Sequence, residues 1–337
     1  MRRSSVFYAV GAFIALLVLA TIGALFMTSH KNALPAPVVA GGETPEASVQ
    51  QTVALIKAAD FAGFWKHALP PADYDTLRRD WTRPRPDEQP VTPEQRADFI
   101  KDMQQLTEPD AETKLYAIAR PKLNQLQQQY HDQVPIMIGI VQNIAITGVA
   151  QSKDLTNPQK QQAAEVINVL APWAQKVPWF DQAKAKQAIA VVVAAARKLD
   201  LKTPEDLRAM DFDTAMQKYD TGFLAIKQVL NIYGLPLDET LDSVKVTLLE
   251  NRNDHARVRL DYILLGKPLS TESELIKQDG RWYSADVLQN VREAHDRLSA
   301  PPAPASSAAA PATPASAAPP PQTAPVKPAT HSSVTKH

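Results

Sequence analysis

Residues 244–283 decide the fold, and they run VKVTLLENRNDHARVRLDYILLGKPLSTESELIKQDGRWY. Apolar and polar residues alternate here, which is typical of strands in a half-buried antiparallel sheet. The alternation predicts strands over 244–249, 256–265, 271–277 and 281–283. We expect turns at Asn251–Asp254 and at Asp279-Gly280, a pair that favours tight hairpins, and a break of the second strand at Gly266-Lys267-Pro268. An amphipathic helix follows, with Val287, Leu288, Val291 and Leu298 on its apolar face.

The residues before this stretch have the hydrophobic spacing of helices instead. Thr92 and Gln95 form a predicted capping box, and Gly234 ends the last long helix as a glycine commonly does. Helices are expected over 48–65, 70–81, 92–106, 110–130 with an interruption near Pro121, 134–150, 157–173, 181–199, from 203, and 212–233. The predicted fold class is α+β: an N-terminal transmembrane helix, a helical bundle, a C-terminal antiparallel β-meander with a closing helix, and a disordered tail.

The strands from Ser243 to Asp286, which close on Asp279-Gly280-Arg281-Trp282-Tyr283, resemble the last strands of nuclear-transport-factor-2-like domains in exported bacterial proteins. The helix Ser48–Trp65, followed by Leu69-Pro70-Pro71-Ala72-Asp73-Tyr74, resembles uncharacterised membrane-anchored bacterial envelope proteins with helices before such a sheet. The resemblance implies an exported domain. The long helical middle departs from the compact, ligand-binding cone of that family, and no catalytic residue of the family has a counterpart here.

The N-terminal segment is predicted to be a membrane anchor. An apolar run from Val6 to Met27 follows Arg2 and Arg3, and as a helix it would extend roughly 33 Å, enough to cross a bilayer core. The two arginines favour a cytoplasmic N-terminus, which places the folded part in the periplasm and the chain in the bacterial inner membrane as a single-pass protein. A cleaved signal peptide is the alternative. The anchor residues are Val6, Phe7, Leu16, Leu17, Leu19, Leu25, Phe26 and Met27.

Composition divides the chain into five predicted parts. These are the cytoplasmic head and anchor (1–30), a linker (31–46), the helical bundle (47–240), the meander with its helix (241–298), and a tail rich in proline and alanine (299–337). Such a tail cannot build a core and is predicted to be disordered. It is either a spacer that reaches an envelope partner or an inert solvated segment.

The apolar stretch 134–150 has two interpretations. A second membrane span is the first, but the run is shorter than a full span and carries Gln142 and Asn143 at its centre. A helix buried inside the bundle is the second, and we expect it.

Composition and motifs exclude several classes of protein. Lys plus Arg and Asp plus Glu both number 36, so no net charge favours nucleic acid, and no nucleic-acid partner is expected. The chain has no cysteine, which rules out disulfides and thiolate chemistry. The seven histidines have no zinc-binding spacing, and no phosphate-binding glycine loop or G-x-S-x-G motif occurs. We therefore predict no catalytic, cofactor-binding or metal-binding residue.

Two functional hypotheses remain. The first is a non-enzymatic envelope protein, a binding or interaction module whose partners are the lipid bilayer and an envelope protein or cell-wall component. The second is an envelope hydrolase or small-ligand-binding domain with a cleft between sheet and helices. A candidate ligand surface comprises Trp65, Asp73, Asp75, Trp81 and Trp282, although aromatic residues of this kind usually belong to the core and the acids to a solvated helix face.

Overall fold

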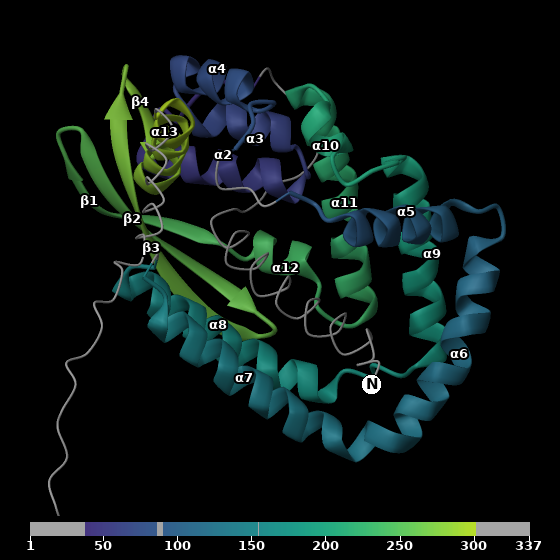
Figure 1. The fold of residues 1–337 in the computed structure, drawn as a ribbon. Helices are drawn as coiled ribbons and strands as arrows, with labels where there is room; N and C mark the ends of the chain where they lie inside the picture. The colour runs from purple at the N-terminus through teal and green to yellow at the C-terminus, as the bar shows by residue number, and fades with distance from the viewer. Residues whose placement is uncertain (1–37, 86–89, 154, 301–337) are drawn as a thin grey trace, which may run out of the picture. The chain divides into compact units, whose positions relative to one another are not determined.

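The computed structural model describes residues 38–85, 90–153 and 155–300. The predicted anchor, residues 31–37 of the predicted linker and nearly all of the tail lie outside these residues. The described chain is α+β, as predicted: a helical region precedes a four-stranded antiparallel sheet and a closing helix (Figure 1).

The sheet is a meander in which each strand pairs with the next along the chain. Its strands are β1 (Lys245–Arg252), β2 (His255–Leu264), β3 (Lys267–Gln278) and β4 (Arg281–Ser284). Gly42 forms a short antiparallel bridge with Trp282, which ties the segment before the first described helix to β4. The expected Asp279-Gly280 hairpin is confirmed, with both residues at positive φ.

The second strand ends within one residue of its expected end, but the third strand begins four residues before its expected start at Thr271. Leu265 and Gly266, both at positive φ, form a two-residue turn, and β3 begins directly at Lys267. Pro268 is tolerated because it lies opposite Ile263, one position from the pair that closes the turn, so its nitrogen faces away from β2. On the side of β3 that faces away from β2, the neighbouring strand β4 pairs only with Leu275–Gln278. The N–H that Pro268 lacks therefore has no partner strand, and no hydrogen bond of the sheet is lost.

The helical region has a break that the hydrophobic pattern did not indicate, and it lacks the break that was expected at Pro121. Both halves of the Thr92–Gln95 capping box are present, and Thr156 with Gln159 forms another. The helices are α2 (Pro45–Lys57), α3 (Phe61–Ala68), α4 (Pro71–Asp80), α5 (Pro93–Thr107), α6 (Ala111–Tyr130), α7 (Val134–Gln151), α8 (Asn157–Lys176), α9 (Gln182–Leu199), α10 (Asp206–Ala209), α11 (Phe212–Ile232), α12 (Leu237–Asp242) and α13 (Ala285–Ser299).

Two predictions of where a helix is continuous or interrupted were wrong. The expected helix 48–65 is two helices, because Ala59 takes a positive φ of 55° and Asp60 then caps α3 by accepting a hydrogen bond from the Gly63 N–H. The expected interruption at Pro121 is absent, since α6 runs through it. A proline inside a helix removes one backbone hydrogen bond, a local loss that the bonds on either side can outweigh.

Helices cover one face of the sheet. Val49 and Val53 of α2 pack on Val258 and Leu260, while α8 packs on the Tyr262 end of the same strand face. The opposite face of β2 carries exposed charged residues such as Arg257 and Arg259. The sheet and the helices therefore share apolar clusters.

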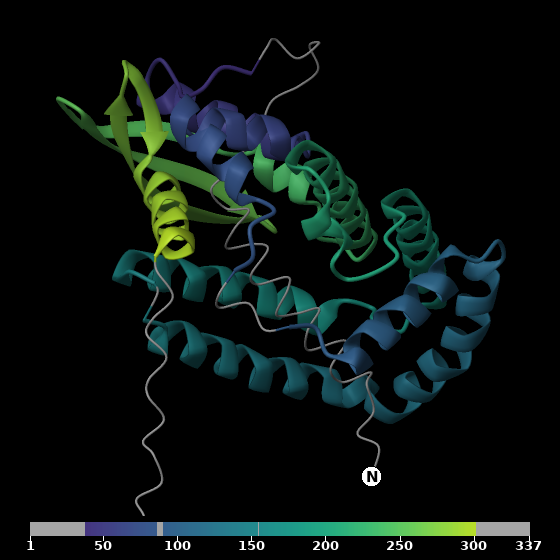
Figure 2. The same ribbon diagram turned by 45° about the horizontal axis from the view of Figure 1, so that its top comes forward.

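Helix α7 is not buried, contrary to expectation. It lies along α8 on the side away from the sheet (Figures 1 and 2), and Ile138 is its one buried residue. The reason is geometric: α8 covers a single side of α7, and no other described helix packs along its length. Among the described residues, the helical stretch Ala111–Gln151 is the one that is long and apolar enough to cross a membrane.

Candidate functional site

The five residues of the predicted ligand surface lie in different surroundings. Trp282 is buried in the cluster between α2 and the sheet, and Trp81 in the cluster between α4 and α11. Trp65 is half-buried beside Phe64, with ring centroids 4.9 Å apart. Asp75 is exposed on α4, whereas Asp73 is engaged in an ion pair. A ligand-binding role for this set stays a prediction.

The acids of α4 hold α13 in place. Asp73 accepts two hydrogen bonds from Arg292, at 3.0 and 2.8 Å. Asp80, 8% exposed, accepts from Arg83 at 2.8 Å and lies 2.6 Å from the His295 Nδ1. Burial alone would raise the pKa of the Asp80 carboxyl, but the hydrogen bonds from Arg83 and His295 outweigh it and lower that pKa. These carboxylates have a structural task.

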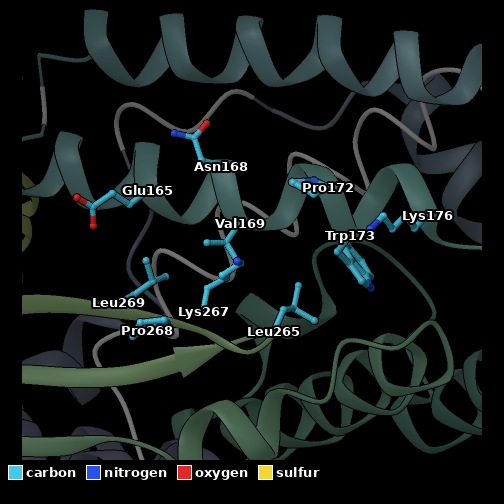
Figure 3. A pocket seen from close by; sticks show the side chains of 10 residues that line it. All are labelled: Glu165, Asn168, Val169, Pro172, Trp173, Lys176, Leu265, Lys267, Pro268 and Leu269. Atoms are coloured by element: carbon cyan, nitrogen blue, oxygen red, sulfur yellow. The ribbon is translucent and has the colours of Figure 1, made fainter.

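A groove opens between α8 and the β2–β3 hairpin (Figure 3). Its cavity measures about 510 Å³, within the range of small-ligand sites. Val169 and Trp173 of α8 face Leu265 and Leu269 of the hairpin across it. These four residues also pack against the buried cluster of α8, β2 and α11, so the groove is the open continuation of that core.

The sequence builds each wall in a simple way. Glu165, Val169, Trp173 and Lys176 recur every three or four residues, which puts them on one side of α8. The opposite wall is the β2–β3 hairpin. Its Leu265-Gly266 turn places Leu265 and the residues that follow it along the opening of the groove. A leucine at positive φ costs about 1 kcal/mol of backbone strain, so the preferences of turn residues do not explain Leu265 at this position. The packing of its side chain explains it better.

Trp173 is fixed in its orientation. Its indole Nε1 donates a hydrogen bond to the Tyr233 carbonyl at 3.2 Å, and its ring meets the edge of Trp179 with centroids 5.8 Å apart. Trp179 in turn stacks on Tyr233 at 5.5 Å. Burial, with a smaller effect of the Asp181 charge, raises the pKa of the Tyr233 hydroxyl, so it stays neutral at physiological pH. The apolar wall is therefore already positioned for a ligand.

The charged residues of the groove are mainly basic. Lys176 and Lys267 are exposed on its lining, and neither makes an ion pair with a described residue. Among the described lining residues Glu165 is the single acid, and Gln161 donates a hydrogen bond to it at 3.1 Å. An apolar floor with two free ammonium groups suits a molecule that has an apolar body and an acidic group.

Sequence reasoning did not identify this groove. The second functional hypothesis did expect a cleft between sheet and helices, but the tryptophans and acids of its candidate ligand surface are other residues. Trp173 and Lys176 stand in an ordinary amphipathic helix, and Lys267 follows a turn. Nothing in either pattern indicates that these two segments meet, because their contact depends on how α8 packs on β3.

Within the described residues, no group of three or more His, Asp or Glu side chains is placed to hold a metal ion. Comparison with protein-family models, with curated proteins and with solved structures finds no match for this chain.

Proposed function

We propose that this chain is a membrane-anchored, non-enzymatic binding module of a bacterial envelope, and that the groove between α8 and the β2–β3 hairpin is its binding surface. The observation that carries the proposal is the lining of the groove: a preformed apolar wall around Trp173, with Lys176 and Lys267 beside it. The ligand class that matches this lining is an amphipathic anion, such as a long-chain carboxylate.

The location in the proposal rests on the apolar run Val6–Met27, which we propose crosses the inner membrane once and holds the folded part in the periplasm. Protease accessibility tests this directly. The folded part should resist protease in intact cells and be digested in spheroplasts. Protection until the spheroplasts are lysed would place it in the cytoplasm and refute the location.

The ligand class can be tested with a photoreactive probe, a dodecanoic acid that carries a diazirine. Membranes that contain the full chain are irradiated with the probe, and the modified residues are mapped by mass spectrometry. We expect modification of α8 around Val169 and of the hairpin around Leu269. The double variant K176E/K267E should lose this modification by roughly tenfold, since each exposed ion pair contributes up to about 1 kcal/mol.

The matched control is K101E/K245E, which reverses two exposed lysines that lie outside the groove and pair with no described acid. It should be modified as strongly as the unaltered chain. No modification of the groove segments, or equal modification in both double variants, would overturn the proposed ligand class.

The second hypothesis, a hydrolase, receives less support from the groove. Hydrolysis by paired carboxylates needs an acid and a base or nucleophile on opposite sides of the substrate. Glu165 has no second carboxylate near it among the described residues of the lining. The geometry supports binding better than turnover.

A further inference from the structure

Helix α7 has two different sides. Toward α8 it presents Ile138, Val141 and Ala145, and its Gln142 amide donates a hydrogen bond to Asn168 of α8 at 2.9 Å. Away from α8 it presents Ile136, Ile140 and Ile144 at a spacing of four residues, which places them along one stripe.

This isoleucine stripe is unusually exposed. The exposed fractions are 66% for Ile136, 56% for Ile140 and 67% for Ile144. The helix Val134–Gln151 contains no Asp, Glu, Lys or Arg in its 18 residues, so the isoleucines have no charged neighbours on their own helix. Scattered single apolar residues are normal on a protein surface, but a charge-free helix with a continuous isoleucine stripe marks an interaction surface.

We propose that the isoleucine stripe of α7 lies on the surface of the lipid bilayer, with the helix parallel to the membrane plane. The apolar run Val6–Met27 is long enough to cross a bilayer, and only residues 28–37 separate it from the described part. Ten residues extend at most roughly 35 Å, so the bilayer stays within reach of the folded part at all times.

An orientation in which α7 crosses the bilayer fits the contacts between α7 and α8 less well. Helix α8 accompanies α7 along its length and itself packs on β3, and α8 carries Lys160, Glu165 and Lys176. Insertion of α7 across the bilayer would take these charges with it or strip α7 from α8, and charges in the bilayer core are costly. Lying in the interface buries the isoleucines and leaves the α7–α8 contact intact.

The proposal goes beyond the groove but rests on the proposed anchor. Because the chain has no cysteine, a single introduced cysteine carries a fluorophore at one known position. The experiment uses the full chain in vesicles whose lipids carry a quencher on the acyl chain. Labels are placed at I140C on the stripe, at L16C in the anchor, and at I263C on β2, where the isoleucine is 51% exposed and serves as the matched control.

We expect strong quenching at positions 16 and 140 and little at 263. Adding I136N and I144N to the I140C chain should reduce its quenching toward the level at 263, while far-UV circular dichroism stays unchanged because both isoleucines are exposed. Quenching at 16 without quenching at 140 would overturn the proposal and leave the anchor standing. No quenching at 16 would refute the anchor itself.

A second copy of the chain is the competing occupant of the stripe. It would protect the label at 140 from dissolved iodide and from the lipid quencher alike, in proportion to the amount of protein per vesicle. That result would also overturn the proposal, as would equal quenching at 140 and 263.

Discussion

Asp80 illustrates how one side chain links two helices that are far apart in the sequence. Its carboxylate, on α4, is bonded to Arg83 and to His295 of α13, and its pKa is lowered despite burial. We expect Asp80→Ala to reduce the free energy of unfolding at neutral pH by about 1–3 kcal/mol, because it removes the buried acceptor of two hydrogen bonds, one of them from a charged arginine. Urea denaturation of the detergent-solubilised chain measures this.

The sign of the pH dependence follows from the lowered pKa. Ionised Asp80 stabilises the fold above the unfolded-state pKa of about 3.9, and this contribution is lost as the pH falls through the folded-state value. The deficit of Asp80→Ala should therefore shrink in acid. Asp75→Ala is the control, since Asp75 is exposed on the same helix. Equal effects of the two substitutions at neutral pH would contradict the role given to Asp80.

Asp220 on α11 presents the opposite case. It accepts a hydrogen bond from the Phe61 N–H at 2.9 Å, and burial, with an added effect of the nearby Asp60 charge, raises its pKa. An acid with a raised folded-state pKa costs stability as the pH rises through that value. Asp220→Asn keeps an acceptor for Phe61 and removes the charge, so it should stabilise the chain at neutral pH by up to about 1 kcal/mol.

The advantage of Asp220→Asn should disappear below the unfolded-state pKa, where the carboxyl of the unaltered chain is protonated in both states. Urea denaturation at several pH values measures the difference. A neutral-pH gain that persists unchanged in acid would show that charge is not its cause.

A glycine-to-alanine substitution should change stability in opposite directions in a helix and in a turn, because the backbone conformation of the glycine differs between them. Gly222 lies inside α11 and Gly280 in the β3–β4 turn at a φ of 77°, and a methyl group added at either meets no atom within 4 Å. Gly222→Ala should stabilise the helix by roughly 0.5–1 kcal/mol. Gly280→Ala should destabilise the turn by about 1–2 kcal/mol, because an L side chain strains at positive φ. Denaturation midpoints of both variants decide this, and equal signs would refute it.

Elements set by local signals were predictable from the sequence. The Thr92–Gln95 capping box and the Asp279-Gly280 turn act within four residues, so their patterns sufficed. Ala59 takes a positive φ without any sequence cue, and the break after α2 was therefore missed. The exposure of α7 and the groove beside Trp173 depend on which helix packs where, which a one-dimensional pattern does not contain.

In the molecule as a whole, the predicted boundary between helical bundle and meander at residues 240–241 falls inside α12, shortly before β1 begins at Lys245, and packing continues across it. Leu230 of α11 shares one apolar cluster with Tyr262 and Leu264 of β2. Leu260, 1% exposed, shares another with Val49 of α2. Shared clusters of this kind make two regions unfold together, because neither keeps its core alone.

Leu260→Ala tests this cooperativity. Loss of a buried leucine should cost about 2–5 kcal/mol of unfolding free energy. Hydrogen exchange followed by mass spectrometry at increasing urea should show α11 and β2 losing protection in one transition, and the substitution should move both by the same amount, although α11 does not contain residue 260. If only the strands move while α11 keeps its midpoint, the bundle and the meander are separate folding units, and the cluster around Leu230 contributes little to either.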